Sequence, residues 1–182
     1  MSDIALNKDD KSSSRQAQWI LRANDHGHFD IQIRSDGSWW HKGEPIKREG
    51  LVRLFASVLH CDHSGQHWLV TPVEKGRIDV EIAPLMVTQV DNQPNGELRI
   101  ATSTLDQAAI GPEHPLAFRQ VILSNQVQWL PFVLIRDSLW AHFNRPSYYK
   151  LMEHVIERDD GSLAITAGDY EVSIPNDAQA PE

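Results

Sequence analysis

Three side chains that could act together on a ligand lie in one short loop. Thr71, Glu74 and Lys75 place a hydroxyl, a carboxylate and an ammonium group close together. A comparable turn later in the chain is shorter and can close tightly through Gly168-Asp169. Because longer loops often carry binding residues, we predict that this loop contacts a ligand. A plain salt-bridged surface turn is the alternative interpretation.

Two arginines lie where helices are expected to begin. Arg48 follows Pro45 and Arg145 precedes Pro146, and proline is common in the first turn of a helix. Cations are disfavoured at a helix N-terminus, whereas an anion bound to the free N–H groups would relieve the conflict. We therefore predict that Arg48 and Arg145 meet an anionic group. The alternative is that neighbouring glutamates neutralise Arg48 and that Arg145 points into water.

The richest set of potential metal ligands consists of His60, Cys61, Asp62, His63 and His67. Imidazole, thiolate and carboxylate groups would suit a transition metal. The spacing fits no standard zinc pattern, because it spans an expected helix end and a glycine turn. We expect a solvated turn here, and we predict no metal site and no cofactor.

No familiar catalytic motif is present. The sequence contains no nucleophile elbow, no P-loop and no GxGxxG segment. Asp159 and Asp160 could pair as acid and base, but they are expected in an exposed turn. We assign no catalytic residue. The enzyme hypothesis that stays open is a small hydrolase or transferase that uses Glu74 and Lys75 as acid and base.

Composition and charge argue against some classes of binding partner. The chain has 182 residues and a net charge of −8, which argues against bulk nucleic-acid binding. No apolar run approaches the ~20 residues that cross a bilayer, and the N-terminus does not resemble a secretory signal. A lone cysteine, Cys61, fits a reducing compartment. We expect a cytoplasmic protein that does not bind membranes.

Hydrophobic periodicity predicts mostly short strands. Residues 29–33 alternate as a strand, Asp36-Gly37 favours a tight turn, and residues 39–42 return. An apolar stripe then predicts a helix from Pro45 to about His60. The further expected strands are 68–73, 78–82, 85–90, 98–102, 121–123, 129–135, 163–166 and 172–174, with a loop at 104–115.

The end of the chain repeats the earlier pattern. Leu139-Trp140 aligns with Trp39-Trp40, Pro146 with Pro45, and Leu151 with Leu54. The turn 158–161 and the strands after it align with the turn 62–65 and its strands. We predict a duplication, although strand, helix and two strands is also a common local order.

These patterns predict an α+β protein of two related halves, each a strand–helix–hairpin motif with mainly antiparallel sheets. The predicted boundaries are a mobile tail at 1–18, an N-terminal half with an extra hairpin at 19–118, a C-terminal half at 119–174, and a second tail at 175–182.

Two groups of residues resemble a known bacterial family. The first is Gly43-Glu44-Pro45-Ile46-Lys47-Arg48, the helix segment Leu54-Phe55-Ala56-Ser57, and Leu69-Val70-Thr71-Pro72-Val73-Glu74-Lys75. The second is Arg136-Asp137-Ser138-Leu139, Asn144-Arg145-Pro146 and Tyr148. Over residues 19–174, the chain resembles the proteins catalogued as domain of unknown function 1285. The charged turn expected of that family is replaced here by the histidine-rich turn 60–67.

The resemblance implies a duplicated core whose second half is loosely like a pleckstrin-homology fold. It also implies a ligand site between the halves, a nucleotide-like ligand and a role in signalling.

Our leading hypothesis is a non-catalytic module that binds a small anionic, nucleotide-like ligand at the junction of the halves. The predicted ligand-binding residues are Arg48, Thr71, Glu74, Lys75, Arg136, Arg145 and Tyr148. The arginines would meet negative charge, and Thr71 and Lys75 would add hydrogen bonds. Glu74 would accept from a ribose hydroxyl or orient Lys75, and Tyr148 or Trp68 would give an aromatic face. A protein–protein adaptor or a homo-oligomer is the further alternative.

Overall fold

Short strands with few helices form two units in the computed structural model, which describes residues 18, 22–123 and 125–176. The first unit comprises Met1–Arg34 and Ser38–Glu81. The second comprises Ser35–Gly37 and Ile82–Glu182. The two predicted tails fall mostly outside the described residues.

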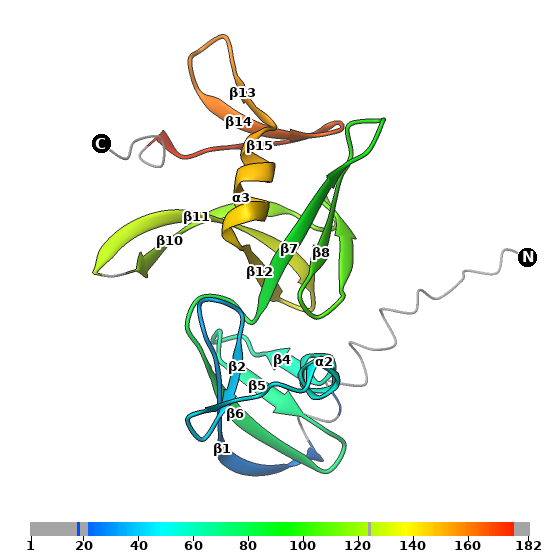
Figure 1. Cartoon of the computed structure of the whole chain (residues 1–182), viewed down its shortest axis with the longest axis vertical. Helices are drawn as coiled ribbons and strands as arrows, with labels where there is room; N and C mark the ends of the chain where they lie inside the picture. The colour runs from blue at the N-terminus through cyan, green and yellow to red at the C-terminus, as the bar shows by residue number, and fades with distance from the viewer. Residues whose placement is uncertain (1–17, 19–21, 124, 177–182) are drawn as a thin grey trace, which may run out of the picture. The chain divides into compact units, whose positions relative to one another are not determined.

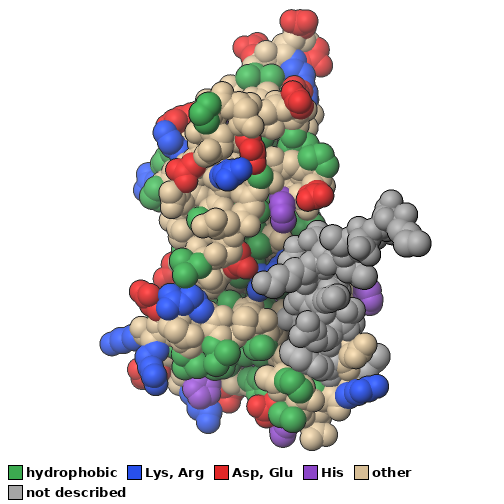
Figure 2. Space-filling view, turned by 90° about the vertical axis from the view of Figure 1, so that its right-hand side faces the viewer, with side chains coloured by type: hydrophobic (Ala, Val, Ile, Leu, Met, Phe, Trp, Pro, Cys, Tyr) green, Lys and Arg blue, Asp and Glu red, His purple; other side chains and the backbone are tan. Residues whose placement is uncertain are grey.

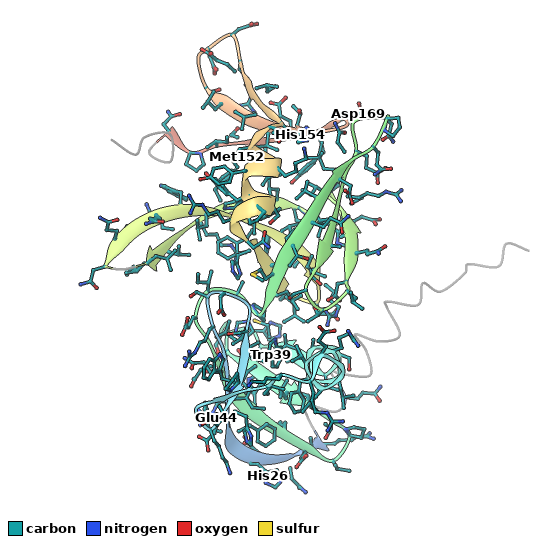
Figure 3. All side chains as sticks on the ribbon, viewed as in Figure 1. His26, Trp39, Glu44, Met152, His154 and Asp169 are labelled. Atoms are coloured by element: carbon teal, nitrogen blue, oxygen red, sulfur yellow. The ribbon has the colours of Figure 1, made fainter. Side chains whose placement is uncertain are left out.

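Residues 24–80 of the first unit form a six-stranded sheet and the helix α2 (Figure 1). The strand order is β3-β2-β1-β6-β5-β4, and only β1 and β6 run parallel. The elements are β1 (Asn24–Ile33), β2 (Trp39–His41), β3 (Glu44–Pro45), α2 (Glu49–Ser57), β4 (Leu59–Cys61), β5 (His67–Val70) and β6 (Glu74–Val80). One face packs on α2, where the buried Trp39, labelled in Figure 3, stacks on Phe55.

In the described part of the second unit there are a six-stranded sheet, a three-stranded sheet and the helix α3. The orders are β10-β11-β12-β7-β8-β9 and β13-β14-β15, and only β12 and β7 run parallel. The elements are β7 (Leu85–Asn92), β8 (Leu98–Thr102), β9 (Gln107–Ala109), β10 (Leu116–Leu123), β11 (Gln126–Arg136), β12 (Leu139–Phe143), α3 (Arg145–Met152), β13 (Val155–Glu157), β14 (Leu163–Ala167) and β15 (Tyr170–Ser173).

The same order of elements occurs in both units. Two antiparallel strands, a helix and a three-stranded meander follow one another as β1-β2-α2-β4-β5-β6 and again as β11-β12-α3-β13-β14-β15, interrupted in the first unit by β3. Individual hydrogen bonds also match, because Val70 N donates to Val58 O and Thr166 N donates to His154 O at equivalent positions. Two similar halves, mostly sheet, are therefore consistent with a duplicated domain.

The aligned turns adopt the same geometry. In the first unit Asp62 N donates to Gln66 O, and Gly65 has a φ of 84°. In the second unit Arg158 N donates to Ser162 O, and Gly161 has a φ of 80°. Such left-handed backbone favours glycine, which explains why this residue stands at the same place in both turns.

Sheet closure differs between the units. In the first unit β6 lies beside β1, so the meander joins the main sheet. In the second unit β10 takes the corresponding edge of β11, and the meander forms a separate sheet that ends at β15. Among the described residues the first unit has no counterpart of β7 to β10, and β10 takes the place beside β11 that β6 has beside β1.

The first helix is shorter than predicted. Pro45 pairs with Trp40 on the edge strand β3, where a missing N–H is tolerated, and α2 begins only at Glu49. The helix ends at Ser57, and Leu59 pairs with Leu69. The prediction that His60 sits in the last helical turn is therefore wrong, because His60 lies on β4.

The boundary between the units lies at Glu81 and Ile82, whereas the sequence placed it at 118 and 119. The reason is that β7 pairs with β12, so the extra hairpin β7–β8 belongs to the second unit. The predicted loop at 104–115 contains the short strand β9.

Candidate functional site

A pocket of about 780 Å³ opens on the second unit. This volume lies within the range of small-molecule sites. Its walls come from β7, β10, β11, β12, the start of α3 and the hairpin tip Ser35–Gly37, which groups with this unit. The lining residues are Ser35, Asp36, Ile82, Met86, Leu123, Gln128, Trp129, Leu130, His142, Phe143, Asn144, Arg145 and Tyr148.

Helix α3 positions the two predicted site residues in this pocket. Arg145 and Tyr148 are three residues apart, so they lie on the same side of the helix. Ser147 is buried and its hydroxyl donates to Val87 O at 2.9 Å, which fixes α3 against β7. The guanidinium of Arg145 lies 5.8 Å from the Tyr149 ring centre.

Arg145 has no carboxylate partner among the described residues. By contrast, Arg136 Nη1 lies 3.1 Å from Asp106 Oδ1, and Arg158 pairs with Glu171. The charge of Arg145 is therefore available to a ligand.

The start of α3 offers few backbone donors. Asn144 is the N-cap, and its side chain accepts from Ser147 N at 2.9 Å. Tyr148 N donates to Asn144 O, and Pro146 has no N–H. An anion here would be held by the Arg145 side chain rather than by the helix terminus, which differs from the mechanism that the sequence suggested.

His142 is a buried polar group in the pocket wall, with an exposed fraction of 3%. Its Nε2 lies 2.9 Å from Ser35 O, and because a carbonyl only accepts, Nε2 carries the proton. Nδ1 is buried and makes no hydrogen bond of good geometry to another described residue. Burial lowers the pKa of His142, against the smaller effects of the Ser35 and Leu85 carbonyls, so the ring is neutral at neutral pH.

We expect acid to destabilise the protein through His142. Its pKa in the folded state lies below the ordinary 6.5, so the unfolded chain takes up the proton more readily. The free energy of unfolding should be insensitive to this group above about pH 6.5 and should fall as the pH drops from there towards the folded-state pKa. Urea denaturation at a series of pH values measures this.

The variant His142→Gln should show a shallower acid slope. Some slope should remain, because burial also lowers the pKa of His67. An Arg99→Gln variant, which removes an exposed charge but no histidine, is the control. An acid slope in His142→Gln as steep as in the original protein would contradict the prediction.

The loop that the sequence predicts to bind a ligand lies in the first unit. Thr71 and Glu74 are hydrogen-bonded to each other within this turn. The Thr71 hydroxyl donates to Glu74 O at 3.0 Å and accepts from Glu74 N at 3.1 Å. Glu74 Oε2 lies 3.6 Å from Nε2 of His26, labelled in Figure 3. Lys75 Nζ lies 5.8 Å from the Trp68 ring centre. Thr71 thus closes a turn, while Lys75 lies against an aromatic ring.

Glu74 and Lys75 are consecutive on β6. Consecutive strand residues point to opposite faces of a sheet, and Lys75 lies with Arg77 near Trp68. This geometry does not favour Glu74 and Lys75 as an acid–base pair acting on one substrate.

Two other predicted residues do not line the pocket. Arg48 is the N-cap of α2 in the first unit, without a side-chain capping bond. Arg136 ends β11 in the second unit, where it pairs with Asp106. The pocket therefore gathers Arg145 and Tyr148, and the other five predicted residues lie elsewhere.

The histidine-rich turn is organised by Asp62. Its Oδ1 accepts from Ser64 N, Ser64 Oγ and Gln66 N, and its Oδ2 accepts from Trp68 Nε1. The hydrogen bonds from Ser64 and Trp68 hold the pKa of Asp62 far below its ordinary value. Within the described part of the chain, no group of three potential ligands could hold a metal ion.

Several lining residues were missed from sequence. Asn144 before Pro146 carries a helix N-cap signal that could have been used. Trp129 and Gln128 lie on a strand whose spacing gives no sign of a pocket. His142 had one available signal, since a histidine between Ala141 and Phe143 on a buried strand needs a partner.

The fold and pocket define a two-unit, mostly β-sheet protein with a candidate small-molecule site. Family models for the N-terminal and C-terminal domains of domain of unknown function 1285 match residues 17–83 and 84–171. The chain belongs to this family, which confirms the resemblance seen in the sequence.

Two solved structures of the same family are similar to this chain. A protein of Silicibacter pomeroyi DSS-3 has 31% identity and a TM-score of 0.74, with 84% of each chain covered. A protein of Shewanella baltica OS155 has 26% identity and a TM-score of 0.53, with 68% of this chain and 91% of that chain covered. No curated protein matches this chain. Among the described residues, neither helix has the length and apolar character needed to span a bilayer.

Proposed function

We propose that this protein is a non-catalytic module that binds a small anionic, nucleotide-like ligand and acts in signalling. The observation that carries the proposal is the pocket of the second unit, where Arg145, which has no carboxylate partner among the described residues, lies with Tyr148 and Trp129. A guanidinium next to aromatic rings suits a ligand with a negative group and a flat ring.

Native mass spectrometry and thermal shift against nucleotides and small metabolite anions test the proposal. A ligand that binds the folded state raises the melting temperature as its concentration increases. If no compound in the panel binds, the proposal is wrong.

Arg145→Gln should weaken binding of a panel hit by about 10- to 100-fold, because one charge-assisted interaction of ~1–3 kcal/mol is lost. Isothermal titration measures the change. Lys150→Gln is the matched control, since Lys150 lies on the same helix but pairs with Glu153 outside the pocket. Equal affinities of Arg145→Gln and the original protein would remove Arg145 from the site.

A second candidate function, a protein–protein adaptor, is favoured by the tip of the β10–β11 hairpin. Ile122 and Val127 are paired across the strands and are 75% and 63% exposed. Paired exposed apolar side chains suit a protein surface better than water. Ile122→Ser together with Val127→Ser should abolish a partner interaction but leave ligand binding intact.

The proposed environment follows from composition and charge. Acidic and basic side chains are interspersed on the face drawn in Figure 2, and the net charge is −8, so a bulk nucleic-acid partner is not proposed. The lone Cys61 supports a cytoplasmic location. A pleckstrin-homology-like second half is also proposed, supported by its antiparallel strands and single described helix, and superposition on such domains tests it.

A further inference from the structure

The charges that line the pocket are few. Arg145 is the one lysine or arginine among the lining residues, and Asp36 is the one acid. One guanidinium can hold one carboxylate or one phosphoryl group through two parallel hydrogen bonds. The pocket thus has the cationic capacity for a single anionic group.

Further negative charge would meet opposition in the same pocket. The lining residues include no second lysine or arginine for an additional phosphate, and unbalanced charge is costly where water is partly excluded. The backbone at the start of α3 offers little compensation, because Asn144 caps Ser147 and Pro146 has no N–H. A diphosphate or triphosphate would therefore retain uncompensated charge.

The rest of the lining is largely apolar. Aliphatic side chains and one thioether share it with three aromatic rings; these residues are Ile82, Met86, Leu123, Leu130, Phe143, Trp129 and Tyr148. Burying apolar ligand surface against them contributes roughly 25 cal/mol per Å². Rings such as those of Trp129 and Tyr148 add a preference for a flat partner.

We infer that the pocket takes a small molecule with a flat, largely apolar body and a single anionic group, and not a nucleoside diphosphate or triphosphate. This inference rests on the proposed function and narrows its ligand class. An aromatic carboxylate and a nucleoside monophosphate both combine a flat ring with one anionic group.

Isothermal titration of the full chain with five probes tests the inference. Adenosine monophosphate and indole-3-carboxylate represent the two sources, adenosine triphosphate adds charge, adenosine lacks it, and inorganic phosphate lacks the ring. We expect at least one single-anion probe to bind ten-fold or more tightly than the triphosphate, adenosine and phosphate. The probe that binds identifies the source.

Two variants sharpen the result. Arg145→Gln should remove the advantage of the single-anion probe over its uncharged analogue, whereas Lys150→Gln should keep it.

The experiment distinguishes a failure of this inference from a failure of the proposed function. If the triphosphate binds more tightly than the monophosphate and loses affinity in Arg145→Gln, the single-anion inference is wrong and the binding module stands. If none of the five probes binds but another panel compound does, the named ligand class is wrong. If nothing in the wider panel binds, both are wrong.

Discussion

Replacing Leu151 with alanine should lower the free energy of unfolding by about 2–5 kcal/mol, the usual cost of emptying a buried leucine site. Leu151 is 0% exposed and lies on α3, one turn after the buried Ser147 that anchors this helix to β7. Truncation would remove packing beneath the helix that carries Arg145 and Tyr148. Urea denaturation followed by circular dichroism measures the loss.

An exposed leucine on the other described helix is the control for this substitution. Leu54 lies on the helix of the other unit, α2, but is 59% exposed. Leu54→Ala should therefore change the free energy of unfolding by no more than about 0.5 kcal/mol, as exposed substitutions usually do. Equal losses in the two variants would show that α3 is not packed as described.

Substituting Gly76 with alanine should cost about 1–3 kcal/mol, the range for forcing an extra methyl into a packed site. Gly76 lies in the middle of β6 beneath the ring of Phe29, and an added Cβ would lie 2.6 Å from three ring atoms. The ring would have to move away from its place beside His26. Thermal unfolding of the purified variant measures this cost.

A second glycine in the same unit should respond in the opposite direction. Gly50 lies in α2, and an added Cβ would meet nothing within 4 Å. Gly50→Ala should stabilise the protein by about 0.5–1 kcal/mol, because alanine favours the helix. If both glycine variants change stability in the same direction, steric contact with Phe29 does not explain the effect at Gly76.

Local features of the fold were predictable from sequence. The hairpin β7–β8, the turn through Gly168-Asp169 and the start of α3 beside Pro146 all follow from turn and cap residues. The end of α2 was predicted wrongly because Val58 and Leu59 continue the helical spacing of apolar residues. Leu59 nevertheless pairs as a strand, and periodicity alone does not separate these states in a short apolar run.

Long-range pairing was not predictable. Whether β10 or β15 lies beside β11 depends on strands that come together from different parts of the chain. Either arrangement satisfies the same alternation of side chains along β11, so the sequence pattern does not decide between them. The pocket could not be predicted for the same reason, since residues far apart in the sequence form its wall. For example, His142 bonds the carbonyl of Ser35, 107 residues earlier. Arg145 and Tyr148 could be proposed because they share one helix turn, but their neighbours could not.

The separate sheet of the second unit leaves β15 as a free edge among the described strands. The bond from Ile174 N to Leu163 O sets the register, so the backbone groups of Glu171 and Ser173 point away from β14. Such an edge can template pairing between molecules, which leads to aggregation. Arg158 bonds the side chains of both edge residues, with 2.6 Å to Glu171 and 3.0 Å to Ser173. Because Arg158 follows β13 at the opposite edge, these bonds brace one face of the three-stranded sheet across its full width.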